Sequence, residues 1–110
     1  MQKISIEALA RQQLKAATSS TSGRAADTVF GGHEKVMRQT VIALLEGRSL
    51  SEHENPGEAT IYVLSGRVQL RMDDIIWEGR IGDLLIVPDA RHSLAAIEDS
   101  TVLMTVAKTS

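Results

Sequence analysis

The sequence predicts an all-β domain, an antiparallel sandwich or barrel, that follows one short N-terminal helix. Apolar and polar residues alternate over short stretches such as 67–72, and glycine, proline and acidic residues separate these stretches at close spacing. A helical periodicity of apolar residues occurs near the N-terminus, before the first of these stretches. About eight short strands after a single helix are typical of a sandwich or a barrel.

Length and composition limit the classes of protein that the chain can belong to. Its 110 residues are enough for one domain with a real core. The 12 basic and 14 acidic residues give a net charge of -2 without a run of one sign, so we expect no nucleic-acid partner. Since cysteine is absent, disulfides and thiolate metal sites are excluded. The first 20 residues contain neither a signal sequence nor a membrane span, so the expected location is the cytoplasm.

The helix is predicted over residues 5–18, with Ser5 as its N-cap. Its apolar positions share one face at spacings of three and four: Ile6, Leu9, Ala10, Leu14 and Ala17. A small, polar segment with Gly23 inside it follows and is typical of a linker. We therefore divide the chain into a helical arm with its linker, residues 1–24, and a β-barrel domain, residues 25–110.

Turn residues separate the predicted strands of the barrel domain. The strands are expected within residues 28–30, 35–45, 53–66, 67–72, 75–77, 84–87, 93–97 and 101–106. In the stretch 53–66 a histidine enters a short strand, a Pro-Gly pair turns the chain and an apolar run follows up to Gly66. For residues 35–45 a helix is the alternative, but the β-branched residues of this stretch favour a strand. Side chains alternate along a strand, so if Ala59, Ile61 and Val63 face the barrel interior, Glu58 and Tyr62 face away from it.

Two stretches resemble the sequence motifs of the cupin family. The stretch from Gly47 to Gly66 is similar to the first motif, in which a glycine is followed by His-x-His, a glutamate and a closing glycine. Residues 82–88, GDLLIVP, followed by His92, are similar to the second motif, in which an apolar strand and a proline lead to the last histidine. The resemblance implies a cupin jelly-roll barrel, the double-stranded β-helix, with the short N-terminal α-helix added to it.

The same resemblance implies a metal site that lacks two of the family's usual ligands. His53 falls at the position of the first motif histidine, Asn55 at that of the second, and Ala59 at that of the glutamate. His53, Asn55 and His92 are therefore the candidate ligands for a divalent ion such as manganese, iron, nickel or zinc. A carboxamide is a weaker ligand than imidazole or carboxylate, which argues against a strongly held ion. The predicted ligand pocket consists of His53, Asn55, His92, Ile61 and Val63.

Three further side chains lie outside the two motifs, and each of them allows more than one placement. His33 follows two glycines and is expected at the surface or in a turn. Arg38, flanked by apolar residues, is expected at a rim or sheet edge because a buried arginine needs a partner; alternatively, it projects into a pocket and binds an anion. Trp77, the single tryptophan, is expected in the core or in an interface.

Three classes of function remain open on the sequence. The favoured hypothesis is a cupin barrel that binds a small molecule, such as a sensor or accessory protein, with weak or no metal binding. The first alternative is a metal-dependent dioxygenase or isomerase that uses His53, Asn55 and His92. The second is a dimeric interaction protein without catalysis. Since nothing identifies a general acid or base, no catalytic residue is assigned. A homodimer is expected under each hypothesis, because the small cupins that the chain resembles often pair through sheet faces.

Overall fold

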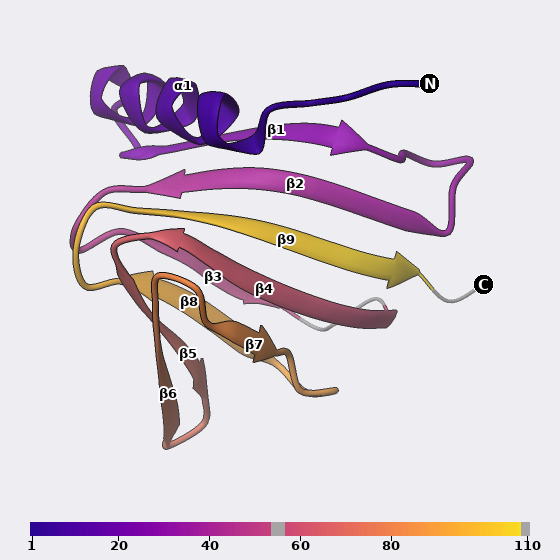
Figure 1. Ribbon diagram of the computed structural model, residues 1–110. Coiled ribbons are helices and arrows are strands. Elements are labelled where there is room, and N and C mark those ends of the chain that lie inside the picture. Colours follow the sequence, from indigo (N-terminus) through magenta and orange to yellow (C-terminus); the bar gives the residue numbers. More distant parts are fainter. Residues whose placement is uncertain (54–56, 109–110) are drawn as a thin grey trace.

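The computed structural model describes residues 1–53 and 57–108, with residues 51–53 described by their backbone alone. This part of the chain forms one helix and nine strands (Figure 1). Their bounds are α1 Ile6–Ser19, β1 Arg24–Phe30, β2 Met37–Leu44, β3 Ser49–His53, β4 Gly57–Ser65, β5 Arg67–Met72, β6 Ile75–Arg80, β7 Leu84–Ile86, β8 His92–Ala96 and β9 Ser100–Lys108. The predicted class, mostly β with one N-terminal helix, is confirmed.

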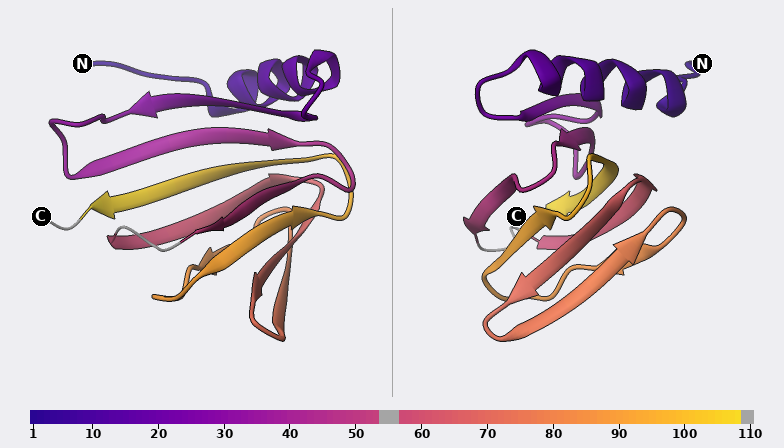
Figure 2. Two further views of the ribbon diagram at one scale, coloured as in Figure 1. Left: turned by 180° about the vertical axis from the view of Figure 1, so that it is seen from behind. Right: turned by 90° about the vertical axis from the view of Figure 1, so that its left-hand side faces the viewer.

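The strands form two antiparallel sheets that pack face to face as a jelly roll. The five-stranded sheet has the order β1-β2-β9-β4-β7, and the four-stranded sheet has the order β3-β8-β5-β6. Figure 2 shows the helix as a third layer on the far side of the five-stranded sheet. Within the described residues no helix has the length and hydropathy needed to span a membrane.

The helix forms where its cap and its apolar face predict it. The Ser5 side chain accepts a hydrogen bond from the Ala8 amide at 3.2 Å, which satisfies one of the amide groups left free in the first turn. The apolar face of α1 packs against β1, β2 and β9. It covers Val41 and Ala43, which point out of the barrel and are fully buried. The helix therefore shields the outer face of the sheet from solvent at these strands.

Strand β4 shows the alternation that its sequence predicts. Ala59, Ile61 and Val63 are buried, whereas Glu58 and Tyr62 are exposed. The register of β4 against β9 is unbroken from Gly57 to Val63, so no bulge turns Glu58 inward. The carboxylate of Glu58, next to the glutamate position of the first motif, therefore lies on the outer surface of the barrel.

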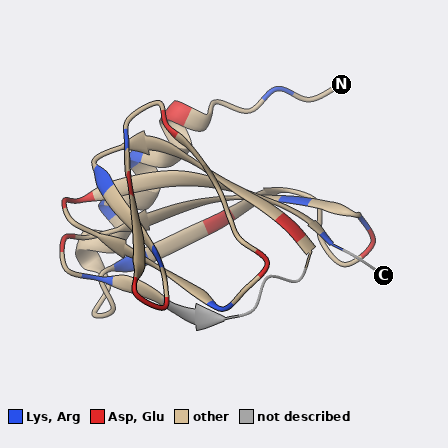
Figure 3. Cartoon of the chain, turned by 90° about the horizontal axis from the view of Figure 1, so that it is seen from below, with Lys and Arg blue, Asp and Glu red and all other residues tan. Residues whose placement is uncertain are grey.

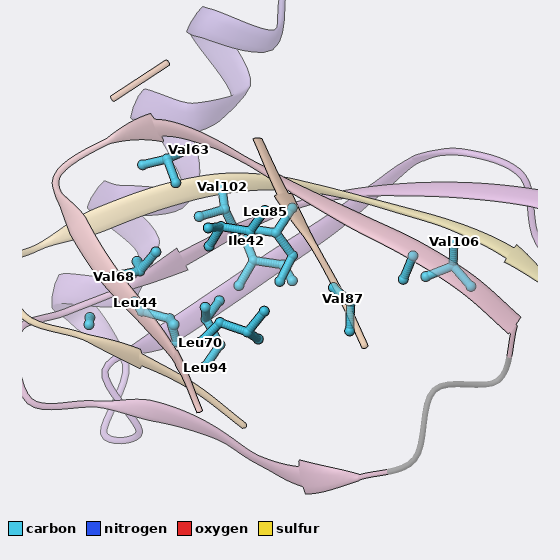
Figure 4. Close-up of a cluster of buried hydrophobic side chains, with 13 residues drawn as sticks. Ile42, Leu44, Val63, Val68, Leu70, Leu85, Val87, Leu94, Val102 and Val106 are labelled. Carbon is cyan, nitrogen blue, oxygen red and sulfur yellow. The ribbon is translucent and has the colours of Figure 1, made fainter. Parts of the chain in front are cut away.

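Aliphatic side chains from both sheets fill the barrel (Figure 4). The cluster contains Ile42, Leu44, Ala59, Ile61, Val63, Val68, Leu70, Leu85, Val87, Leu94, Ala96, Val102 and Val106. Figure 4 shows Val63 and Val106 at opposite ends of this cluster. Close packing of this kind excludes water and stabilises the two sheets against each other.

The structure differs from the predicted elements at β1 and β6. Strand β1 begins at Arg24, where the sequence suggested a linker, and its Ala25 lies opposite Ala43 beneath the helix. Small side chains suit this position because the helix lies close to the sheet. Strand β6 continues through Gly79, which was expected in a turn; a Cβ atom there would lie 3.0 Å from Leu85 Cδ1. The absence of a side chain lets Leu85 pack over the strand.

A tight corner joins β4 to β5 and moves the chain from one sheet to the other. Gly66 adopts a φ of 80°, which glycine reaches without steric cost. The next amide, that of Arg67, donates a hydrogen bond to Ser100 Oγ at 2.9 Å. A Cβ atom on Gly66 would lie 2.3 Å from both Asp99 O and Ser100 Oγ. The closing glycine of the first motif is thus required by the backbone and by its neighbours.

Candidate ligand site at the barrel mouth

The barrel has a mouth where β2 and β4 begin and where β8 begins in the facing sheet. On the five-stranded sheet, Arg38, Val106 and Ala59 lie side by side in register and mark this end. On the four-stranded sheet, His92 and the last residue of β3 mark it. The other end is closed by the aliphatic cluster around Leu44 and Val63. A ligand that enters the barrel meets the residues of the mouth first.

His92 is the described histidine that lies inside the barrel. Its exposed fraction is 5%, and it begins β8, whose next inward residue is Leu94. The imidazole Nδ1 lies 2.9 Å from Ala90 O. Because a carbonyl oxygen only accepts, Nδ1 is the donor in this bond. In the neutral ring this bond leaves the lone pair on Nε2, which is an acceptor.

The backbone register brings the two motif histidines together. His53 lies opposite His92 across β3 and β8. A bulge between Leu50 and His53 precedes this pair, since Leu50 lies opposite Leu94. Asn55, the third candidate ligand, lies outside the described residues. The predicted set of His53, Asn55 and His92 thus remains a prediction, with its two histidine backbones adjacent.

An apolar pocket of about 150 Å³ lies on the barrel-facing side of β5 and β6. It is lined by Leu70, Met72, Ile75, Trp77 and Pro88. Strand register pairs Met72 with Ile75 and Leu70 with Trp77. Strand β5 pairs with β8 as far as Arg71 and Ser93, and Leu70 of the pocket lies opposite Leu94. The pocket and His92 therefore lie toward the same end of the four-stranded sheet, because Met72 follows Arg71 and His92 precedes Ser93 along the chain.

Trp77 was expected in the core or in an interface, and its position excludes the core, while the interface stays a prediction. The side chain is 56% exposed, because β6 is the edge strand of its sheet and extends beyond the cover of the facing strands. One feature of the sequence could have predicted this pocket. The two-residue turn Asp73-Asp74 pairs Leu70 with Trp77, so both side chains must share a face.

The remaining candidate residues have distinct places. Ile61 and Val63 belong to the closed aliphatic cluster and are buried, which puts them deeper than the mouth. His33 is exposed in the connection between β1 and β2, as expected. Arg38 stands on the barrel-facing side of β2 and is partly buried. Figure 3 shows basic and acidic positions mixed along the chain rather than separated.

The fold is similar to that of solved cupins. A cupin superfamily protein from Desulfitobacterium hafniense matches with a TM-score of 0.71 and 20% identity, over 78% of this chain and 78% of that chain. An RmlC-like cupin protein from Desulfovibrio desulfuricans matches with a TM-score of 0.67 and 25% identity, over 76% and 81%. The chain is therefore a small protein with the cupin fold, as its two motifs predicted.

The conserved SPY1581 protein of unknown function from Streptococcus pyogenes also has this fold. It matches with a TM-score of 0.72 and 24% identity, over 83% of this chain and 79% of that chain. No protein-family model matches the sequence, and no curated protein is significantly similar to it. These comparisons assign a fold, so the function must be argued from the site.

Proposed function

We propose that the protein binds a small organic molecule at the mouth of its barrel. The apolar body of the ligand occupies the pocket at Trp77, and a polar group of the ligand faces His92. The observation that carries this proposal is the apolar pocket on the barrel-facing side of β5 and β6, at the end of the sheet where β8 begins with the buried His92. Apolar pockets that contain a few placed polar groups are the usual form of small-molecule sites.

The size of the pocket limits the ligand. Its volume of about 150 Å³ is below that of a typical drug-binding cavity. Apolar cavities of roughly this size hold a molecule such as benzene. The pocket therefore takes one ring or a short aliphatic chain, and the rest of a larger ligand lies along the mouth.

Substitution of Ile75 by serine is expected to weaken this binding about tenfold or more, because the variant removes apolar contact from the pocket. The measurement is a thermal-shift screen of small aromatic and aliphatic compounds against the wild type. Compounds that raise the melting temperature are then titrated against the variant. A bound ligand stabilises the folded state by mass action, so weaker binding gives a smaller shift.

Ile76 supplies the matched control for this experiment. It follows Ile75 in β6 but points to the opposite face of the sheet. The exposure of the two residues is similar, 54% for Ile76 and 48% for Ile75. Ile76→Ser should keep the ligand-induced shift of the wild type. An equal loss of binding in both variants would place the ligand elsewhere, and the absence of any stabilising compound would count against a small-molecule function.

A metal-dependent activity is the second candidate, supported by the pairing of His53 with His92 across β3 and β8. The described side chains do not complete a metal centre by themselves. No cluster of three or more His, Cys, Asp or Glu occurs among them, and Glu58 faces outward. This proposal therefore depends on His53 and Asn55 joining His92. A divalent ion in such a site would supply Lewis acidity, and His92 would hold it through Nε2.

Under this second proposal, zinc or nickel is expected to raise the melting temperature of the wild type and not of His92→Ala. His33→Ala is the control, because His33 is exposed in a loop far along the chain from the motif. Metal content after purification without added metal, measured for all three proteins, checks the result independently. Equal content in the wild type and His92→Ala would remove the metal candidate.

We also propose that the chain forms a homodimer through the outer face of β4 and β7. The helix covers the outer face at β1, β2 and β9, which leaves the β4–β7 half without a cover. Tyr62 and Leu84 are cross-strand neighbours there, and Ile86 lies opposite Thr60. All three apolar side chains are exposed. Exposed apolar groups that share a face are typical of protein–protein contacts.

The double variant Leu84→Asp, Ile86→Asp is expected to sediment as a monomer at concentrations where the wild type is a dimer. Burying two unpaired carboxylates in an apolar contact costs several kcal/mol, about a hundredfold or more in the association constant. Ile76→Asp, on the outer face of the other sheet, is the control and should sediment like the wild type. A monomeric wild type would contradict the dimer.

A further inference from the structure

Arg38 stands on the barrel-facing side of β2, at the mouth. It pairs in register with Val106 of β9, a member of the interior cluster. The neighbouring residues confirm the orientation, since side chains alternate along a strand. Ile42, four residues on, lies in the interior cluster. Gln39 points the opposite way and donates to Thr105 Oγ1 at 3.1 Å on the outer face.

Among the residues that the structure describes, the guanidinium group of Arg38 has no counterion. Within the described part of the chain, no hydrogen bond or ion pair involves Arg38, although the residue is partly buried. No Asp or Glu occupies a barrel-facing strand position among the described side chains. The two other basic side chains on this face of the five-stranded sheet each have a backbone carbonyl as partner. Lys108 Nζ binds Gly32 O, and Arg24 Nη1 lies 3.4 Å from Ser49 O.

A partly buried guanidinium is stabilised when an anion pairs with it. The planar fork of arginine binds a carboxylate through two parallel hydrogen bonds. One cation without a partner matches one negative charge, which favours a monocarboxylate over a phosphate dianion. We infer that Arg38 binds the carboxylate of the ligand whose apolar body occupies the pocket at Trp77. This inference rests on the proposed function and specifies its ligand class.

Strand register leads from Arg38 to the rim of that pocket, past residues whose side chains are buried in the interior cluster. Along the five-stranded sheet, Arg38 is followed by Val106 and then by Ala59. The amide of Val87 donates to Ala59 O at 3.0 Å, and Val87 is followed by Pro88, which lines the pocket. Three strand spacings amount to about 14 Å. The Arg38 side chain projects from β2 toward the barrel interior rather than along the sheet, so a ligand that joins its guanidinium to the pocket needs an extended apolar chain, and hexanoate is the probe chosen for the test.

The experiment compares hexanoate with its uncharged analogue hexanamide. Both are titrated into the full chain, and binding is followed through the indole N–H signal of Trp77 in NMR spectra, which is a single signal because the chain has one tryptophan. The proteins compared are the wild type, Arg38→Gln, Arg38→Lys and Arg71→Gln. Arg71 is exposed on the outer face of β5, where it contacts Gln69, and serves as the control.

Arg38→Gln is expected to weaken hexanoate binding about ten- to hundredfold and to leave hexanamide unchanged, because a hydrogen-bonded charge pair is lost. Arg38→Lys keeps the positive charge but lacks the planar guanidinium, so its affinity for hexanoate should lie between that of Arg38→Gln and that of the wild type. Arg71→Gln should match the wild type. If both compounds bind the wild type and Arg38→Gln affects them equally, or affects neither, the inference fails while the proposed function stands. If neither compound shifts the Trp77 signal of the wild type, both fail.

Discussion

Gly66→Ala is expected to lower the free energy of unfolding by more than about 3 kcal/mol, a loss large enough to abolish folding of a marginally stable domain. Two costs add in this variant. A non-glycine residue at a φ of 80° is strained, and its Cβ atom would lie 2.3 Å from Asp99 O and Ser100 Oγ. Neither neighbour is the mobile end of a long side chain, so the corner itself must move.

Gly47→Ala separates the two costs. Gly47 has a φ of 81°, but a Cβ atom there would meet nothing within 4 Å. In this variant the free energy of unfolding should fall only by the cost of backbone strain, about 1–2 kcal/mol. Urea unfolding of both variants, followed by circular dichroism, gives the two free energies on one scale. Similar losses at the two positions would mean that the corner absorbs the extra atom without strain.

Ile42→Ala is expected to lower the free energy of unfolding by about 2–5 kcal/mol. Ile42 is buried in the interior cluster of the barrel, and its removal leaves a cavity between the two sheets that close packing cannot fill. The change should appear as a lower urea midpoint with an unchanged slope, because the extent of the folded structure stays the same.

Ile76→Ala is the matched control for this loss. Both isoleucines lie in strands, but Ile76 is more than half exposed on the outer face of β6. Its truncation should cost less than about 1 kcal/mol, chiefly through strand propensity. A comparable loss in both variants would show that β6 is covered in solution by something other than this chain.

Local patterns predicted most of the fold. The alternation of residues 67–72 identified β5 with its observed bounds, and Ser5 identified the start of α1. The predictions failed where a distant contact decides the conformation. Ala25 resembles a linker residue because alanine has little strand preference, and only the helix above it and β2 beside it make it part of a strand.

The site was less predictable than the fold. The motif histidines were located by resemblance, and the β3–β8 register places their backbones opposite each other. The apolar pocket at Trp77 was missed, because hydrophobicity alone assigns a large aromatic residue to the core. The exposure of a side chain on an edge strand depends on where the facing sheet ends. The periodicity of the sequence does not report the extent of the facing sheet.

The exposure of Trp77 determines what the intrinsic fluorescence of this protein reports. The single indole already contacts water in the folded state, and it shares its pocket with Leu70, a member of the interior cluster. Its emission is therefore expected to respond to unfolding of the barrel and, under the proposed function, to a molecule that displaces the water next to it. One fluorophore can then follow stability and ligand binding in the same sample.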